Sequence, residues 1–86
     1  MPIEVTPAFK RRLKRKSDEQ QAAIHECVRR LAENRHHPGL RTHSVQGRPG
    51  VFEARIDRAN RLTFHWEDDL LVLRNHCNHD VLNKNP

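Results

Sequence analysis

Residues 51–80 read VFEARIDRANRLTFHWEDDLLVLRNHCNHD, and this stretch decides the fold. Apolar and polar residues alternate along it with the period of a β-strand in three runs: 51–56, 61–66 and 70–78. The polar connections 57–60 and 67–69 between the runs are short enough for antiparallel hairpins. We therefore expect three neighbouring antiparallel strands.

The alternation gives the predicted sheet one apolar face and one polar face. The apolar face carries Phe52, Ala54, Ile56, Leu62, Phe64, Trp66, Leu71 and Leu73, and we interpret Phe64 and Trp66 as core. The polar face carries Val51, Glu53, Arg55, Arg61, Thr63, His65, Arg74 and His76. Cross-strand ion pairs explain one acid and one base, but not three arginines and several histidines. This composition favours a site for an anionic substrate.

Two helices are expected before these strands. Pro2–Val5 has the pattern of a short first strand, and Thr6-Pro7 is a helix start with an N-capping hydroxyl and a proline at the first helical position. Ser17–Gln20 fits a capping box, so a second helix begins there and ends near Asn34. The two helices should form an antiparallel hairpin.

Between the helices and the three strands we expect one more strand at Leu40–Gln46 and a turn at Gly47–Gly50. The tail Val81–Pro86 has no assignment. The element order predicts an α+β fold in which an N-terminal strand and a helical hairpin precede a three- to four-stranded antiparallel sheet, with both helices on one face.

The composition limits the possible partners. The chain has 86 residues, so we expect one domain over 1–86. Its net charge of +5, with seven further histidines, favours a polyanionic partner such as RNA, DNA or an acidic protein. Cys27 and Cys77 lack metal-ligand spacing and suit reduced thiols of a cytoplasmic protein. No apolar stretch approaches the roughly 20 residues that a membrane span needs.

The polar face contains groups that suit metal-independent RNA cleavage. That reaction needs a base for the 2′-hydroxyl proton, an acid for the departing 5′ oxygen, and cations for the charge on the phosphorane. Glu53 is the candidate base. The candidate phosphate clamps are Arg55, Arg61 and Arg74. His79 is the first candidate acid, and His76 and His65 are the seconds.

Strict alternation creates a difficulty for His79, because it places this residue with Leu73 and Cys77 rather than on the polar face. A bulge, or the end of the strand, is needed to bring it into the site. The segment His76–Asp80 also permits a metal hypothesis. Neighbouring strand residues point to opposite faces, however, so we expect no metal site and no cofactor.

With these elements in place, the chain resembles the RelE/ParE toxin superfamily of bacterial toxin–antitoxin systems over nearly its full length. Besides the helical hairpin, the resemblance depends on residues 40–47, 50–56, 60–64 and 73–82. Its more specific parts are the Arg-Leu-x-Phe start of the middle strand and the terminal x-His-Asp-x-Leu.

The resemblance implies a ribosome-dependent endoribonuclease that cuts mRNA without a metal and leaves a 2′,3′-cyclic phosphate. It places the phosphate-stabilising arginine of the family on Arg61, the last-strand acid on His79 and the acidic residue on Glu53. It adds a histidine before the glycine turn, His43, and a basic group at Arg55. The chain contains no tyrosine, so Asp80 or His76 would replace the last-strand tyrosine of many members. The lysine pair of some members is also missing.

Two other functions remain open on the same fold. One is a gyrase-inhibiting toxin of the ParE type, and the other is a non-catalytic module that binds RNA or an antitoxin. The expected partners are a cognate antitoxin, in a complex that is oligomeric, together with the ribosome and mRNA. We expect the basic first helix to bind ribosomal RNA through Lys10, Arg11, Lys14 and Arg15, although these residues also suit a solvated helix face.

Overall fold

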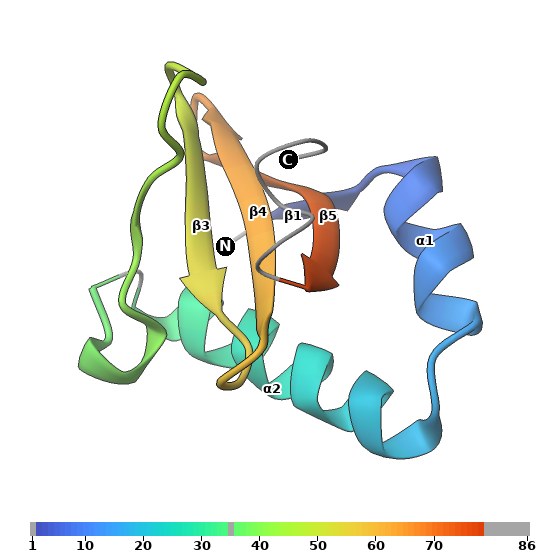
Figure 1. The fold of residues 1–86 in the computed structure, drawn as a ribbon. Helices are drawn as coiled ribbons and strands as arrows, with labels where there is room; N and C mark the ends of the chain where they lie inside the picture. The colour runs from blue at the N-terminus through green and yellow to red at the C-terminus, as the bar shows by residue number, and fades with distance from the viewer. Residues whose placement is uncertain (1, 35, 79–86) are drawn as a thin grey trace.

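A computed structural model describes residues 2–34 and 36–78 of the chain. The elements follow in the order β1 (Ile3–Val5), α1 (Pro7–Lys14), α2 (Asp18–Glu33), η1 (Pro38–Leu40), β2 (His43–Ser44), β3 (Val51–Arg55), β4 (Asn60–Glu67) and β5 (Leu70–Asn78). Figure 1 shows the sheet with α2 passing beneath it and α1 beside β5. The predicted α+β fold is confirmed.

The five strands form one sheet in the order β1-β5-β4-β3-β2. The hairpins β3–β4 and β4–β5 are antiparallel, as predicted. β1 pairs with β5 in parallel, which brings the N-terminal strand to the sheet edge beside the last strand. The predicted strand Leu40–Gln46 is reduced to the two residues of β2, because Leu40 ends a 3-10 turn and Arg41 has a φ of 48°. An extended strand cannot include such a residue.

Both helices begin where their capping residues predict. The Thr6 hydroxyl accepts a hydrogen bond from the Phe9 amide, with Pro7 at the first helical position. Ser17 and Gln20 form the reciprocal capping box of α2, and Asn34 caps its C-terminal end. These signals are local, so the sequence located them correctly.

The helices cover one face of the sheet, as predicted. Phe9 from α1 and Ile24, Cys27 and Leu31 from α2 pack against the apolar face of β3, β4 and β5. That face supplies Ala54, Leu62, Phe64, Leu71 and Leu73 to the same core. The helices do not lie alongside each other as a hairpin, however. In Figure 1 α1 runs down past β5 and α2 turns away at a steep angle toward β3.

β5 contains an irregularity that determines which residues reach each face. Leu73 pairs with Phe64 and Asn75 pairs with Thr63, so Arg74 is an extra residue without a partner on β4. Beyond this bulge the alternation is inverted, and His76 pairs with Leu62 on the helix-covered face. The prediction that His76 lies on the polar face with Arg74 is therefore wrong, because the bulge offsets the alternation by one residue.

No helix within residues 2–34 and 36–78 has the length and hydropathy needed to cross a membrane.

Candidate functional site

The polar face, which is the sheet face turned away from the helices, carries the predicted charged residues in adjacent cross-strand rows. Arg55 pairs with Arg61 in one row, Glu53 pairs with Thr63 in the next, and Val51 pairs with His65 in a third. This register places Arg61 diagonally next to Glu53, about 7–8 Å apart for residues of this relation. Carboxylate and guanidinium groups therefore share one face, as predicted.

Glu53 is buried and paired with a histidine. It is 3% exposed, and its Oε1 lies 2.5 Å from Nε2 of His43, the residue opposite it on β2. The His43 side chain is 59% exposed, and its Nδ1 lies 2.8 Å from the Arg41 carbonyl oxygen. A carbonyl oxygen only accepts, so Nδ1 carries a hydrogen. One further proton is then shared between Nε2 and the carboxylate.

This pair differs from the free surface base that the sequence suggested. A carboxylate this buried requires a partner for its charge, and His43 supplies it. Since the imidazole remains exposed, it connects the buried carboxylate with solvent. The two residues therefore form one proton-holding unit at the edge of the polar face.

Arg55 and Arg61 lie directly opposite each other on β3 and β4. Like charges in this position repel, and neither arginine forms an ion pair with another of the described residues. One terminal nitrogen of Arg61 donates to the carbonyl oxygens of Asp57, Arg58 and Asn60 at 2.8, 3.3 and 3.0 Å, which fixes the side chain over the β3–β4 turn. The Asp57 carboxylate accepts from Ala59 and Asn60 of the same turn instead. Two arginines at opposite positions, neither paired with a carboxylate of the described residues, suit a phosphate.

The predicted phosphate ligands His65 and Arg74 contact each other. A terminal nitrogen of Arg74 lies 3.0 Å from His65 Nδ1, and His65 Nε2 lies 3.1 Å from a Glu67 carboxylate oxygen. Because Arg74 only donates, His65 accepts at Nδ1 and donates to Glu67 at Nε2. These residues balance one another's charge near the β4–β5 turn, as the alternative of cross-strand pairing proposed.

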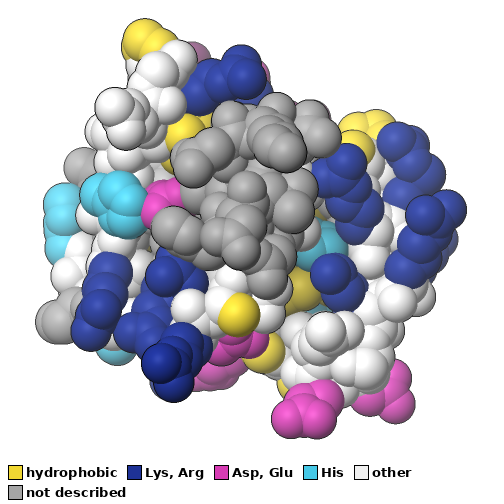
Figure 2. Space-filling model, viewed as in Figure 1, with side chains coloured by type: hydrophobic (Ala, Val, Ile, Leu, Met, Phe, Trp, Pro, Cys, Tyr) yellow, Lys and Arg dark blue, Asp and Glu magenta, His cyan; other side chains and the backbone are white. Residues whose placement is uncertain are grey.

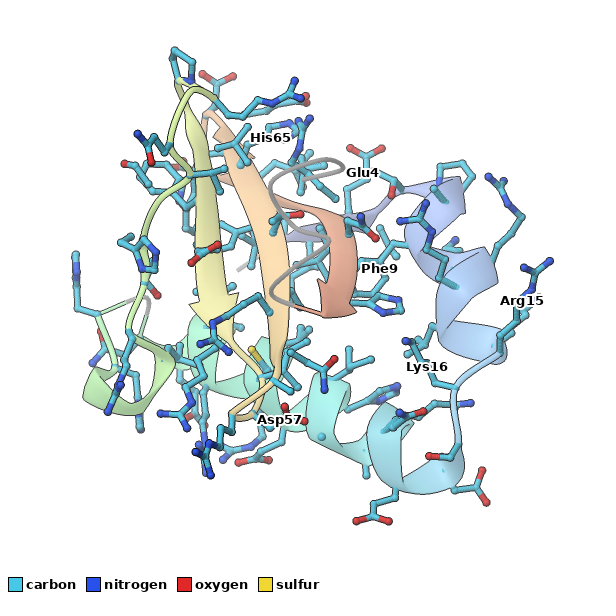
Figure 3. The ribbon with its side chains drawn as sticks, viewed as in Figure 1. Glu4, Phe9, Arg15, Lys16, Asp57 and His65 are labelled. Atoms are coloured by element: carbon cyan, nitrogen blue, oxygen red, sulfur yellow. The ribbon has the colours of Figure 1, made fainter. Side chains whose placement is uncertain are left out.

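His76 lies in the core rather than in the site. It is 2% exposed, its ring contacts the Phe9 ring edge-to-face at 4.5 Å, and its Nε2 donates to the Phe9 carbonyl at 3.2 Å. Burial lowers the pKa of His76, and the positive charges of Lys16 and Arg12 lower it further. Phe9 points from α1 toward the sheet, as Figure 3 shows. His76 is therefore a neutral packing residue between α1 and β5.

The polar face also includes an apolar part, which is larger than the predicted one. Val51 and Val72 are buried on this face at 7% and 4% exposure, and neighbouring Val45 is buried at 5%. Val51 lies on the polar face as predicted, and Val72 joins it there although the predicted face does not include it. The signal was present in the sequence, because Val72 alternates with Leu71 and Leu73.

The basic residues of α1 lie apart from this site. Lys10, Arg11, Lys14 and Arg15 are exposed, and none forms an ion pair with a residue of the described ranges. On α2, by contrast, Arg29 pairs with Glu26 at 2.5 Å and with Glu33 at 2.8 Å. Figure 2 shows Lys and Arg side chains gathered along α1 and, separately, near the end of β3. Arg15 projects away from the sheet in Figure 3.

The other predicted site residues, His79 and Asp80, lie outside the described residues, as does the tail 81–86. Within the described ranges, no three His, Cys, Asp or Glu side chains come together in a way that could hold a metal ion.

Solved structures provide the comparison with known proteins. No family model and no curated protein matches the sequence. The YoeB/ParE toxin from Agrobacterium tumefaciens superposes with a TM-score of 0.75 at 14% identity, over 92% of this chain and 99% of that chain. The YoeB–YefM complex from Staphylococcus aureus gives 0.75 at 15% identity, over 92% and 97%. YafQ from E. coli strain BL21(DE3) gives 0.72 at 21% identity, over 93% and 94%.

The chain has the fold of these toxins. The superpositions cover nearly the whole of each chain, so they include the helices, the five-stranded sheet and the hairpins that hold Glu53, Arg55 and Arg61. The fold that the family resemblance implied is confirmed.

Proposed function

We propose that this protein is the toxin of a bacterial toxin–antitoxin system and that it cuts mRNA on the ribosome. The observation that supports this most directly is the Arg55–Arg61 row, which forms no ion pair with the described residues, beside the Glu53–His43 pair. A cation pair next to a proton-holding unit is what the cleavage of a phosphodiester by its own 2′-hydroxyl requires. The toxin fold agrees with this assignment.

The proposed reaction proceeds in one displacement at phosphorus. The Glu53–His43 unit first releases its shared proton to solvent through the exposed imidazole and then takes the proton from the 2′-hydroxyl, and the freed oxygen attacks the phosphorus. Arg55 and Arg61 neutralise the charge that develops on the non-bridging oxygens. His79 gives a proton to the departing 5′ oxygen. The products are a 2′,3′-cyclic phosphate and a 5′-hydroxyl end.

The partner that we propose is an antitoxin whose binding surface is acidic. Arg55, Arg61 and the exposed α1 residues Lys10, Arg11, Lys14 and Arg15 provide positive charge that no carboxylate of the described residues pairs with, and an acidic segment would neutralise it. The YoeB–YefM complex shows a toxin of this fold with a partner chain. We expect the toxin–antitoxin complex to be oligomeric.

The test is to add the purified protein to translating ribosomes and map the 3′ ends of the mRNA. We expect cuts in the ribosomal A site, and a rate about 10²–10⁴-fold lower for Glu53→Gln and for His43→Gln. Glu67→Gln and His25→Gln make the same chemical changes at exposed positions outside the unit and should cut normally. Circular dichroism must show that all four variants are folded.

Two results would contradict the proposal. Intact mRNA together with DNA double-strand breaks in cells would favour a gyrase-inhibiting toxin. RNA binding by wild type without any cutting would favour a non-catalytic module.

A further inference from the structure

A cavity of about 540 Å³ lies at the β2 edge of the sheet, outside the site described above. Its floor consists of aromatic residues from β3 and β4, which are Phe52, Phe64 and Trp66. Its rim comes from the segment that precedes β3 and includes His36, His37, Arg41 and His43. Among the described residues that line it there is no carboxylate. An aromatic floor beneath a basic rim matches a ligand that is flat and anionic.

The three aromatic rings of the cavity floor pack against one another. The Phe52 and Phe64 rings lie 5.8 Å apart at 26°, and the Trp66 ring meets Phe64 edge-on at 6.3 Å and 89°. Phe64 is 1% exposed, whereas Phe52 and Trp66 are only half-buried. The inner ring is therefore part of the core, and the two outer rings are accessible to a further flat group.

The rim contains an unsatisfied hydrogen-bonding group. Thr42 lines the cavity, and its hydroxyl oxygen is buried and has no hydrogen-bond partner among the described residues. A buried hydroxyl without a partner is unfavourable, so rotation of this side chain toward a ligand that supplies a partner gains affinity. The edge of a nucleobase carries donors and acceptors that can fill this role.

The charge on the two sides of Trp66 is opposite. A second hollow next to it shares His36 with the cavity but is also lined by three carboxylates, Glu33, Asp68 and Asp69, which would repel a phosphate. The cavity with Arg41 and the three histidines is the side that an anionic ligand prefers. A purely apolar ligand would not distinguish the two sides in this way.

His43 connects this cavity with the polar face. It is one of the residues that line the cavity, and its side-chain Nε2 contacts Glu53 on the neighbouring strand β3. Since β2 consists of only two residues, a strand of RNA that passes this short edge reaches both the cavity and the polar face of the sheet. One nucleotide could then place its base in the cavity while the adjacent phosphate lies at Glu53, Arg55 and Arg61.

We propose that the cavity binds one nucleobase of single-stranded RNA, next to the linkage that is cut. The identity of the ligand depends on the proposed ribonuclease function, whereas binding itself can be measured without cleavage. Phe52 and Trp66 stack on the base, Thr42 meets its edge, and Arg41 with His36 and His37 contacts the sugar–phosphate chain.

The test uses the intrinsic fluorescence of Trp66, which is the one tryptophan of the chain. The probe is a 2′-O-methyl RNA trinucleotide, which the 2′-hydroxyl mechanism cannot cleave. We expect the trinucleotide to quench the Trp66 fluorescence in a saturable way. Its affinity for the Phe52→Leu variant should be lower by about tenfold or more. Arg41→Asn should also weaken binding severalfold, because asparagine tolerates the positive φ of this position but lacks the charge. Arg48→Asn removes an exposed arginine outside the cavity and should bind like wild type.

Three results would overturn this proposal. The first is an equal loss of affinity in Arg41→Asn and Arg48→Asn, which would mean that only overall charge matters. The second is competition by ribose 5-phosphate as strong as that by 5′-AMP, which would mean that the base is not bound. The third is binding of the uncharged apolar dye N-phenyl-1-naphthylamine in the cavity that the trinucleotide does not displace, which would assign the cavity to an apolar partner.

Cleavage measurements separate this proposal from the previous one. A protein that binds the trinucleotide as described but leaves mRNA on ribosomes intact would contradict the ribonuclease function alone. A protein that cuts mRNA with equal efficiency in wild type, Phe52→Leu and Arg41→Asn would contradict the nucleobase site alone. Thermal unfolding identifies any variant that loses affinity because it is misfolded. If Phe52→Leu is misfolded, Arg41→Asn still tests the proposal, because Arg41 is exposed.

Discussion

At the scale of single residues, the positions of Arg55 and Arg61 are costly for folding. Two guanidinium groups directly across a strand pair repel, and such pairs lower the stability of a sheet. The Arg61 side chain is nevertheless held in place by three carbonyl oxygens of the β3–β4 turn. A charge that is fixed in position, with no acidic partner in residues 2–34 and 36–78, is ready to meet an anion without rearrangement.

Replacing Arg61 by alanine should therefore reduce cleavage far more than stability. We expect the cleavage rate to fall by about 10²–10³-fold. The free energy of unfolding should fall by only about 1 kcal/mol, because the lost hydrogen bonds are partly offset by relief of the repulsion with Arg55. Cleavage kinetics and urea denaturation measure the two quantities, with Arg58→Ala in the same turn as the control. If cleavage declines only in step with unfolding, Arg61 is a structural residue.

His76 should make the stability of the protein dependent on pH. Its pKa lies below the ordinary value of 6.5 because it is buried, so the folded state resists protonation that the unfolded state accepts. The contribution of neutral His76 to the free energy of unfolding is complete above pH 6.5. Below pH 6.5 this contribution is lost, by up to about 1.4 kcal/mol per pH unit. The charged groups near it are Lys16, Arg12 and, across a small cavity, Asp57.

The measurement is the free energy of unfolding in urea between pH 7.5 and 5.5, a range chosen to lie above most carboxylate titrations. His76→Gln keeps a side-chain N–H donor and should flatten this dependence, while His25→Gln, at an exposed position of α2, should not. An unchanged slope in His76→Gln would show that other groups cause the dependence.

At the scale of elements, the bulge in β5 organises the junction between the sheet and α1. The extra residue lets Leu71 and Leu73 face the core on one side of Arg74 while His76 faces Phe9 on the other. The same region is joined to the start of α1, because the Thr6 amide donates to the Leu73 carbonyl and the Thr6 hydroxyl donates to the Arg74 carbonyl. The bulge therefore positions α1 against β5.

Deletion of Arg74 should be tolerated, whereas deletion of Val72 should not. Without Arg74 the strand alternates regularly, and Leu71, Leu73 and His76 keep their faces. We expect a loss of about 1–2 kcal/mol from the hydrogen bonds with Thr6. Without Val72 the residues on either side change faces and polar groups enter the core. Thermal unfolding of the two deletion variants tests this, and equal losses would contradict the assignment of Arg74 as the extra residue.

At the scale of the whole molecule, the distribution of charge separates a binding surface from a reaction site. The net charge is +5, and the exposed α1 residues Lys10, Arg11, Lys14 and Arg15 form no ion pair within the described part of the chain, while α2 balances its own charges. A long polyanion such as ribosomal RNA can contact α1 while a shorter strand reaches the polar face of the sheet. The two functions can therefore be separated by mutation.

Replacing the α1 cations by glutamine should weaken ribosome binding and reduce its salt dependence. With Lys10, Arg11, Lys14 and Arg15 all replaced, we expect the slope of log affinity against log salt to become shallower by roughly 3, since each contact contributes about 0.7. Sedimentation with ribosomes at several salt concentrations gives the slope. Arg29→Gln and Arg30→Gln on α2 serve as controls, because these arginines contact Glu26 instead. A slope that stays constant would mean that α1 is only a solvated face.

The sequence by itself determined the elements and most of the polar face. Capping residues at Thr6 and Ser17 fix the helix starts through local hydrogen bonds, and the alternation of β3 and β4 places Glu53, Arg55 and Arg61 on one face. These features depend on neighbours along the chain, which a sequence contains directly.

Only the tertiary structure decided where His76 lies, which residue shares a proton with Glu53, and how the helices are oriented. The face on which His76 lies depends on a bulge in β5, and packing between β4, β5 and α1 sets the position of that bulge. The Glu53–His43 contact depends on the register between β2 and β3, two strands joined by a turn of irregular geometry. Such features arise from contacts between distant segments, and the free energy of those contacts is not expressed in the periodicity of any one segment.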